Sequence, residues 1–184
     1  MKRLFLALDI PDVVKNVLLA FQPRPGAGVR PVSREGLHLT LCFIGVADIE
    51  QVHRTVCGLH AREVPLQIKG LGRYGHAKGG VLWAGVAPCE GLLALQRRLS
   101  VALLQADIPV DTKRFRPHIT LARYKAGVSK SRIERFLQQS DLLELDPVRI
   151  LEFVLFSSDT RQEGAVYRIE RTYPLIGIGR NQLL

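Results

Sequence analysis

The chain has 184 residues, nearly half of them apolar, and a formal net charge of +9. This length and composition predict one globular unit with a filled core and argue against a disordered or fibrous chain. The apolar run near the N-terminus is too short for a signal peptide, and no other run approaches the length of a membrane span. We therefore expect a cytoplasmic protein that does not enter a membrane.

The positive charge favours polyanionic partners through long-range attraction and counterion release. Arginine, which outnumbers lysine here, suits planar recognition of phosphate. Charge alone does not separate a nucleic-acid-binding protein from an ordinary basic one. The three cysteines, Cys42, Cys57 and Cys89, lack the paired spacing of a metal site, and we interpret them as buried free thiols.

Apolar periodicity predicts alternating strands and helices along the chain. In the first half we expect a strand at 2–8, a helix at 11–21, a strand at 37–44, a helix at 48–61, and strands at 64–71 and 81–86. In the second half we expect a helix at 90–106, a strand at 118–123, a helix at 129–139, and strands at 148–156 and 165–173. Segments 22–34, 72–80 and 157–164 have the composition of loops.

The order of these elements repeats with a period near 80 residues. Each half has a helix, a loop, a strand that begins at a histidine motif, a glycine, a second helix and a strand pair. We therefore predict a single bilobal domain over 1–184 that arose by internal duplication of units at about 1–87 and 88–184.

A His-apolar-Thr-apolar (HxTx) pattern occurs twice, at residues 38–41 and 118–121. Side chains alternate between the two faces of a strand, so each copy places its imidazole and hydroxyl on one face and its aliphatic groups on the other. The aliphatic face can pack in a core while the polar face lines a cleft. The two polar faces carry His38 with Thr40 and His118 with Thr120.

Two such faces suit acid/base chemistry on a phosphate. In-line displacement at phosphorus needs a base at the attacking oxygen and an acid at the leaving oxygen, on opposite sides of the phosphate. Histidine serves as either near neutral pH, and threonine hydroxyls donate to the non-bridging oxygens. The symmetry of the motifs leaves open which histidine is the acid.

Several residues near the motifs are candidates for substrate contact. Arg123, five residues after His118, points away from the histidine on an ideal flat strand, but a twisted strand could bring its guanidinium to the phosphate. Phe43 holds the equivalent place after His38. We regard Phe43, Arg116 and Tyr124 as candidate base or RNA contacts, with core packing or solvation as the alternative for each.

Other site types have weaker support. We find no paired histidine or cysteine spacing for a catalytic metal, and neither motif carries a carboxylate. The glycine-rich segment 72–80 lacks the Lys-Ser/Thr ending of a nucleotide-binding P-loop, and there is no Gly-x-Ser-x-Gly hydrolase elbow.

With these motifs the chain resembles the 2H phosphoesterase superfamily, in particular the RNA 2′,3′-cyclic phosphodiesterases, also called 2′-5′ RNA ligases. The segments that carry the resemblance are 30–45 and 116–123. The resemblance implies an α+β fold of two pseudo-twofold-related lobes, each an antiparallel sheet with helices packed outside, and a central cleft that carries both motifs.

The resemblance also implies the reaction and its residues. It implies hydrolysis of RNA 2′,3′-cyclic phosphate ends to 2′-phosphomonoesters, and 2′-5′ ligation when an RNA 5′-hydroxyl replaces water. His38 would be the proton donor and His118 the proton acceptor, while Thr40, Thr120 and Arg123 would bind the phosphate. No metal or cofactor is implied, and we expect a monomer whose RNA partners include tRNA fragments.

Two alternatives stay open at this point. The physiological substrate could be a 2′-5′-linked oligonucleotide, which the same chemistry would cleave. The chain could also be an RNA-binding module that keeps the cleft without useful catalysis, although its intact motif residues argue against this.

Overall fold

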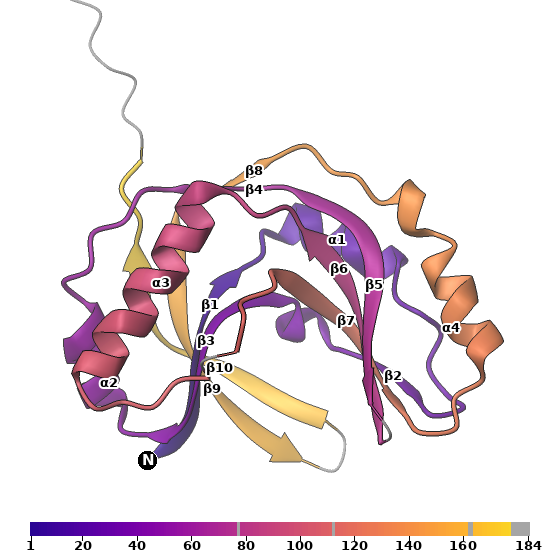
Figure 1. Cartoon of the computed structure of the whole chain (residues 1–184), viewed down its shortest axis with the longest axis horizontal. Coiled ribbons are helices and arrows are strands. Elements are labelled where there is room, and N and C mark those ends of the chain that lie inside the picture. The colour runs from indigo at the N-terminus through magenta and orange to yellow at the C-terminus, as the bar shows by residue number, and fades with distance from the viewer. Residues whose placement is uncertain (77, 112, 162–163, 178–184) are drawn as a thin grey trace, which may run out of the picture.

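The computed structural model describes residues 1–76, 78–111, 113–161 and 164–177 (Figure 1). Most strands join one antiparallel path, which comprises β1 (Lys2–Asp9), β2 (Val29–Pro31), β3 (His38–Ala47), β5 (Ile68–His76), β6 (Gly79–Val86), β7 (His118–Lys125), β9 (Glu152–Arg161) and β10 (Gly164–Pro174). Their order is β10-β9-β1-β3-β7-β6-β5, and β2 pairs with β7. The remaining strands, β4 (Val64–Leu66) and β8 (Val148–Ile150), pair only with each other.

The strand path consists of two lobes that join at one point. The first lobe comprises β10, β9, β1 and β3, and the second comprises β2, β7, β6 and β5. A single pair, Leu39 opposite Ile119, connects β3 to β7. Figure 1 shows the two lobes diverging from this junction, with the β9–β10 hairpin on one side and the β5–β6 hairpin on the other.

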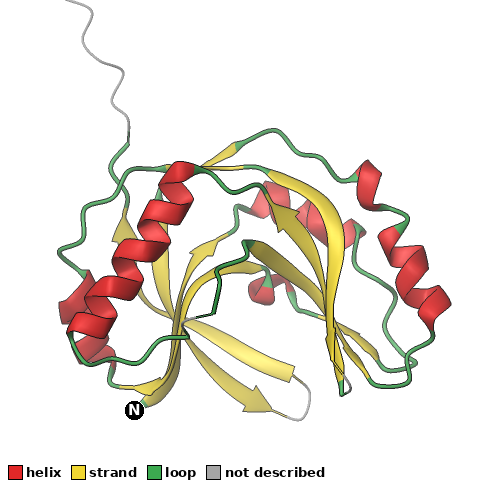
Figure 2. Cartoon of the chain, viewed as in Figure 1, coloured by secondary structure: helices red, strands yellow, loops and turns green. Residues whose placement is uncertain are grey.

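Four α-helices occur among the described residues, α1 (Asp12–Ala20), α2 (Ile49–Val56), α3 (Glu90–Gln105) and α4 (Lys130–Leu137). On α3, leucines at helical spacing are buried: Leu92, Leu95, Leu99 and Leu103. Figure 2 shows α2 and α3 beside the first lobe and α4 along the outer side of the second. The predicted α+β class with antiparallel sheets is confirmed.

Several predicted element boundaries are wrong. The expected strand at 64–71 is two strands, because β4 pairs with β8 while β5 pairs with β6. The expected strand at 148–156 is divided in the same way between β8 and β9. Strand β2 lies within the expected loop at 22–34, and the helix expected at 48–61 ends at Val56.

Two segments predicted as loops are mostly strand. Segment 72–80 forms the ends of β5 and β6, and segment 157–164 forms the ends of β9 and β10; residues 77 and 162–163 lie outside the described residues. The glycines of segment 72–80 serve close packing. A Cβ on Gly72 would lie 2.1 Å from the Trp83 ring, and one on Gly80 would lie 2.0 Å from the Tyr74 carbonyl oxygen.

The core lies mainly between the lobes and the helices outside them, and no helix in the described part of the chain is long and apolar enough to cross a membrane. The three cysteines are free, but only Cys42 is buried. Cys89 is partly buried and Cys57 is exposed, so the expectation of three buried thiols is wrong for these two.

Candidate active site

The two HxTx motifs cross at the junction of the lobes. The central residues of the motifs, Leu39 and Ile119, pair with each other and are fully buried. Because β3 and β7 run antiparallel at this pair, His38 lies toward Thr120 and Thr40 lies toward His118. The junction therefore gives a near-twofold arrangement in which the imidazole of each motif faces the hydroxyl of the other.

A β-bulge after each threonine brings additional side chains to the motif face. In β3 the register against β1 skips Leu41, since Ala7 pairs with Thr40 and Leu6 pairs with Cys42. In β7 the register against β6 skips Leu121 in the same way. The extra residue reverses the alternation, so two successive residues face the core and the next returns to the cleft.

The side chains returned to the cleft are Phe43 and Arg123, and both are exposed. The flat-strand expectation for Arg123 is therefore wrong, because it assumed unbroken alternation. The bulge turns this side chain to the hollow that His38 lines, without requiring strong strand twist.

A hollow of about 430 Å³ opens beside the junction. It brings together His38, Thr40, Phe43 and Arg123 with residues that the sequence analysis did not single out: Arg3, Phe5, Arg30, Ser158, Ala165 and Tyr167. His118 and Thr120 are not among its lining residues and adjoin it through the Leu39–Ile119 pair. Arg30 begins a segment that carries the family resemblance, but only the pairing of β2 with β7 shows that it lies opposite Arg123.

His38 lies in an aromatic enclosure. Its ring centroid is 4.8 Å from that of Phe5, 5.1 Å from Tyr167 and 5.6 Å from Phe156, and its Nδ1 is buried without a hydrogen-bond partner among the described residues. Burial lowers the His38 pKa to about 4, and the positive charge of Arg123 contributes in the same direction. In the free protein this imidazole is therefore neutral at pH 7.

His118 is held by a backbone hydrogen bond. Its Nδ1 lies 2.7 Å from the carbonyl oxygen of Arg116. A carbonyl only accepts, so Nδ1 carries the hydrogen and Nε2 is left to exchange protons in the cleft. The ring packs edge-on against Tyr74 at 5.2 Å, and Trp83 lies at 6.2 Å.

The other two candidate contacts are placed differently. The guanidinium of Arg116 lies 6.0 Å from the centroid of the Tyr74 ring, so it flanks the His118 side of the junction. Tyr124 directs its ring across Gly75 and Gly80, and its hydroxyl donates to the Tyr74 carbonyl oxygen at 3.2 Å. Tyr124 therefore braces the β5–β6 hairpin and is not among the residues that line the hollow.

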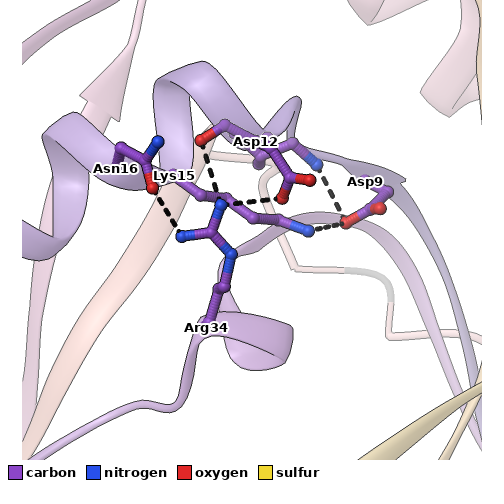
Figure 3. Close-up of polar contacts among 6 residues, drawn as sticks. Asp9, Asp12, Lys15, Asn16 and Arg34 are labelled. Carbon is purple, nitrogen blue, oxygen red and sulfur yellow. Dashed lines mark hydrogen bonds and ion pairs between the residues drawn. The ribbon is translucent and has the colours of Figure 1, made fainter.

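A polar network fixes the chain where β3 begins (Figure 3). Asp9, which pairs with His38 across β1 and β3, accepts a hydrogen bond from the Lys15 ammonium at 2.8 Å. Just before β3, the Arg34 guanidinium donates to Asn16 at 2.7 Å and to the Asp12 carboxylate at 2.9 Å. These contacts tie β1 and the turn that precedes β3 to α1, and so help to position the first histidine.

The junction thus combines two imidazoles, two hydroxyls and a guanidinium free of ion pairs among the described residues. Such a set can move protons at two places and stabilise an anion between them.

Known proteins share both the sequence and the fold. The family model described as the 2′-5′ RNA ligase superfamily matches residues 13–161. A Thermus thermophilus protein named RNA 2′,3′-cyclic phosphodiesterase is 32% identical, covering 98% of this chain and 94% of its own length. An Aquifex aeolicus protein of the same name is 30% identical over 79% of this chain and 81% of its own.

Solved structures of other proteins share this fold. A crystal structure of a Thermus thermophilus protein superposes with a TM-score of 0.76 at 28% identity, covering 96% of this chain and 99% of that one. The crystal structure of Escherichia coli LigT complexed with 3′-AMP gives a TM-score of 0.75 at 22% identity, covering 95% and 98%, and shows the shared fold. The chain therefore belongs to the 2′-5′ RNA ligase superfamily.

Proposed function

We propose that this protein hydrolyses RNA 2′,3′-cyclic phosphate ends to 2′-phosphomonoesters by two-histidine acid/base catalysis without a metal. The observation that carries the proposal is the crossing of the two motifs at Leu39 and Ile119, with Arg123 turned to the same face by the bulge. The relatives named RNA 2′,3′-cyclic phosphodiesterase support the substrate class.

In the proposed mechanism, Nε2 of His118 takes a proton from water as its oxygen bonds to phosphorus. The bond from phosphorus to the 3′ oxygen breaks on the opposite side, and His38 donates a proton to that oxygen. Thr40, Thr120 and Arg123 stabilise the charge on the non-bridging oxygens. The product is a 2′-phosphomonoester with a free 3′-hydroxyl.

The same site would support ligation. If an RNA 5′-hydroxyl takes the place of water, the same displacement forms a 2′-5′ linkage. Water is far more concentrated than RNA ends, so we expect hydrolysis to dominate. We further propose that the protein acts as a cytoplasmic monomer on RNA ends such as those of tRNA fragments.

Incubation with adenosine 2′,3′-cyclic phosphate in EDTA tests the reaction directly. We expect full turnover in the chelator and adenosine 2′-phosphate as the product, identified by chromatography against both monophosphate standards. Adenosine 3′-phosphate as the product would mean that the opposite ester bond breaks. Loss of activity in EDTA that zinc restores would contradict a metal-independent mechanism.

Removing one threonine hydroxyl should weaken catalysis less than removing a histidine. Thr40→Val or Thr120→Val deletes one donor to the transition state and keeps the side-chain shape, so we expect kcat to fall roughly tenfold to a thousandfold. The matched variants Thr40→Ser and Thr120→Ser keep the hydroxyl and should retain most activity. Steady-state kinetics on the cyclic nucleotide separate the cases, and a valine variant with wild-type kcat would remove that threonine from the mechanism.

A further inference from the structure

The hollow beside His38 carries more positive charge than a cyclic phosphate needs. Three guanidiniums line it, those of Arg3, Arg30 and Arg123, and no carboxylate is among its lining residues. None of the three forms an ion pair with a described residue. A 2′,3′-cyclic phosphate brings a single negative charge, so the described lining has positive charge left for another anion.

Arg30 and Arg123 lie together, whereas Arg3 lies apart. The first two are directly opposite each other on β2 and β7, so both can reach one phosphate. Arg3 is on β1, four residues from Ala7, the partner of Thr40. At the rise of a strand this separates Arg3 from the level of Thr40 by about 13 Å along the sheet. This separation is between backbone levels, and the long arginine side chains can close it to the spacing of the two phosphates of one nucleotide.

Arg3 lies among side chains that can contact a nucleotide, and it also borders a neighbouring hollow that Asp159 lines. Its guanidinium lies 5.7 Å from the centroid of the Phe43 ring, and Phe43 is 43% exposed. Ser158 is directly opposite Arg3 on β9, and Tyr167 is opposite Ser158 on β10. All three residues line the hollow, where they provide a guanidinium, two hydroxyls and an aromatic ring.

We propose that Arg3, with Ser158 beside it, is a second anion subsite that binds the phosphate on the 5′ side of the terminal nucleotide. The cyclic phosphate lies at the junction of the motifs, and the terminal nucleoside lies between the two phosphates against Phe43. The inference rests on the proposed function for the identity of the first phosphate. It makes the protein selective for the end of an RNA strand over a cyclic nucleoside phosphate that lacks a 5′ phosphate.

Binding measurements test the subsite independently of turnover. We would titrate the protein with adenosine 2′-phosphate and with adenosine 2′,5′-bisphosphate by calorimetry. For the wild type we expect the bisphosphate to bind roughly tenfold more tightly, on the scale of one charged hydrogen-bonded contact at a solvated site. In Arg3→Gln the ratio of the two affinities should fall toward one.

Lys2→Gln is the matched control because it removes the same charge from the neighbouring residue. Lys2 borders a neighbouring hollow with Arg3 and Ser158, but it does not line the hollow that contains Phe43 and His38. Its ammonium is held by Glu170 at 2.7 Å, so the variant should keep the wild-type affinity ratio. Equal affinity of the wild type for both ligands, no binding of either, or a preference that persists in Arg3→Gln would each overturn the subsite. Turnover of adenosine 2′,3′-cyclic phosphate, measured on the same samples, tests the proposed function separately.

Discussion

Replacing either motif histidine by alanine is expected to lower kcat for a 2′,3′-cyclic nucleotide by roughly a hundredfold to ten-thousandfold. Each variant removes one of the two proton transfers, and no other histidine among the described residues lies at the junction to replace it. His118→Ala also frees the Arg116 carbonyl that fixes the ring. Steady-state kinetics in EDTA at several pH values provide the measurement.

The two histidines need different controls because their surroundings differ. His38 fills an aromatic enclosure, so His38→Ala leaves a cavity, and His38→Gln, closer in size, should show the same loss of kcat with less loss of stability. His60→Ala removes an exposed histidine and should leave kcat unchanged. Thermal unfolding of each variant separates a catalytic loss from a folding loss. Wild-type turnover by a folded His38 or His118 variant would contradict the two-histidine mechanism.

The sequence was informative wherever local pattern decides structure. Alternation along residues 38–41 and 118–121 correctly predicted polar and buried faces, because the bulges reverse the alternation only from Cys42 and Ala122 onward. The mixture of strands and helices also followed from local periodicity, whereas the α+β class with antiparallel sheets followed from the family resemblance. The positions of Phe43 and Arg123 did not follow, since a bulge depends on the register with a partner strand and leaves no mark in the strand that contains it.

The β5–β6 hairpin is another feature that depends on strand pairing and could not be predicted from local sequence. Glycines at 72, 75 and 80 have the composition of a loop, yet Gly72 is needed because the Trp83 ring lies across it. Only the pairing of β5 with β6 reveals that contact. The enclosure of His38 is equally non-local, since Phe5, Phe156 and Tyr167 come from three different strands. The lowered pKa of His38 therefore could not be predicted from the motif alone.

That lowered pKa leads to the second large effect we expect, a rise in the His38 pKa when an anion binds. With a pKa of about 4 in the free protein, only about one molecule in a thousand carries the proton at pH 7. A general acid must hold that proton. Burial and the charge of Arg123 disfavour the imidazolium, and a phosphate bound at the junction would offset the positive charge of Arg123.

The shift can be followed by nuclear magnetic resonance of the imidazole rings, with and without adenosine 2′-phosphate. We expect the His38 pKa to rise in the complex, while the exposed His60 ring stays unchanged and serves as the internal control. The same shift should appear in kinetics. The alkaline limb of kcat/KM, which reports the free protein, should lie at lower pH than the alkaline limb of kcat, which reports the complex.

The outcome also decides the roles that motif symmetry leaves open. If the pKa of His38 stays near 4 in the complex, this histidine is almost entirely neutral across the working range, which favours it as the proton acceptor. His118 would then be the acid, and the 3′ oxygen would leave on its side of the junction. If the pKa of His38 instead rises on binding, the bound phosphate allows this histidine to hold the proton that a general acid needs. The aromatic enclosure then keeps His38 neutral only until a phosphate binds.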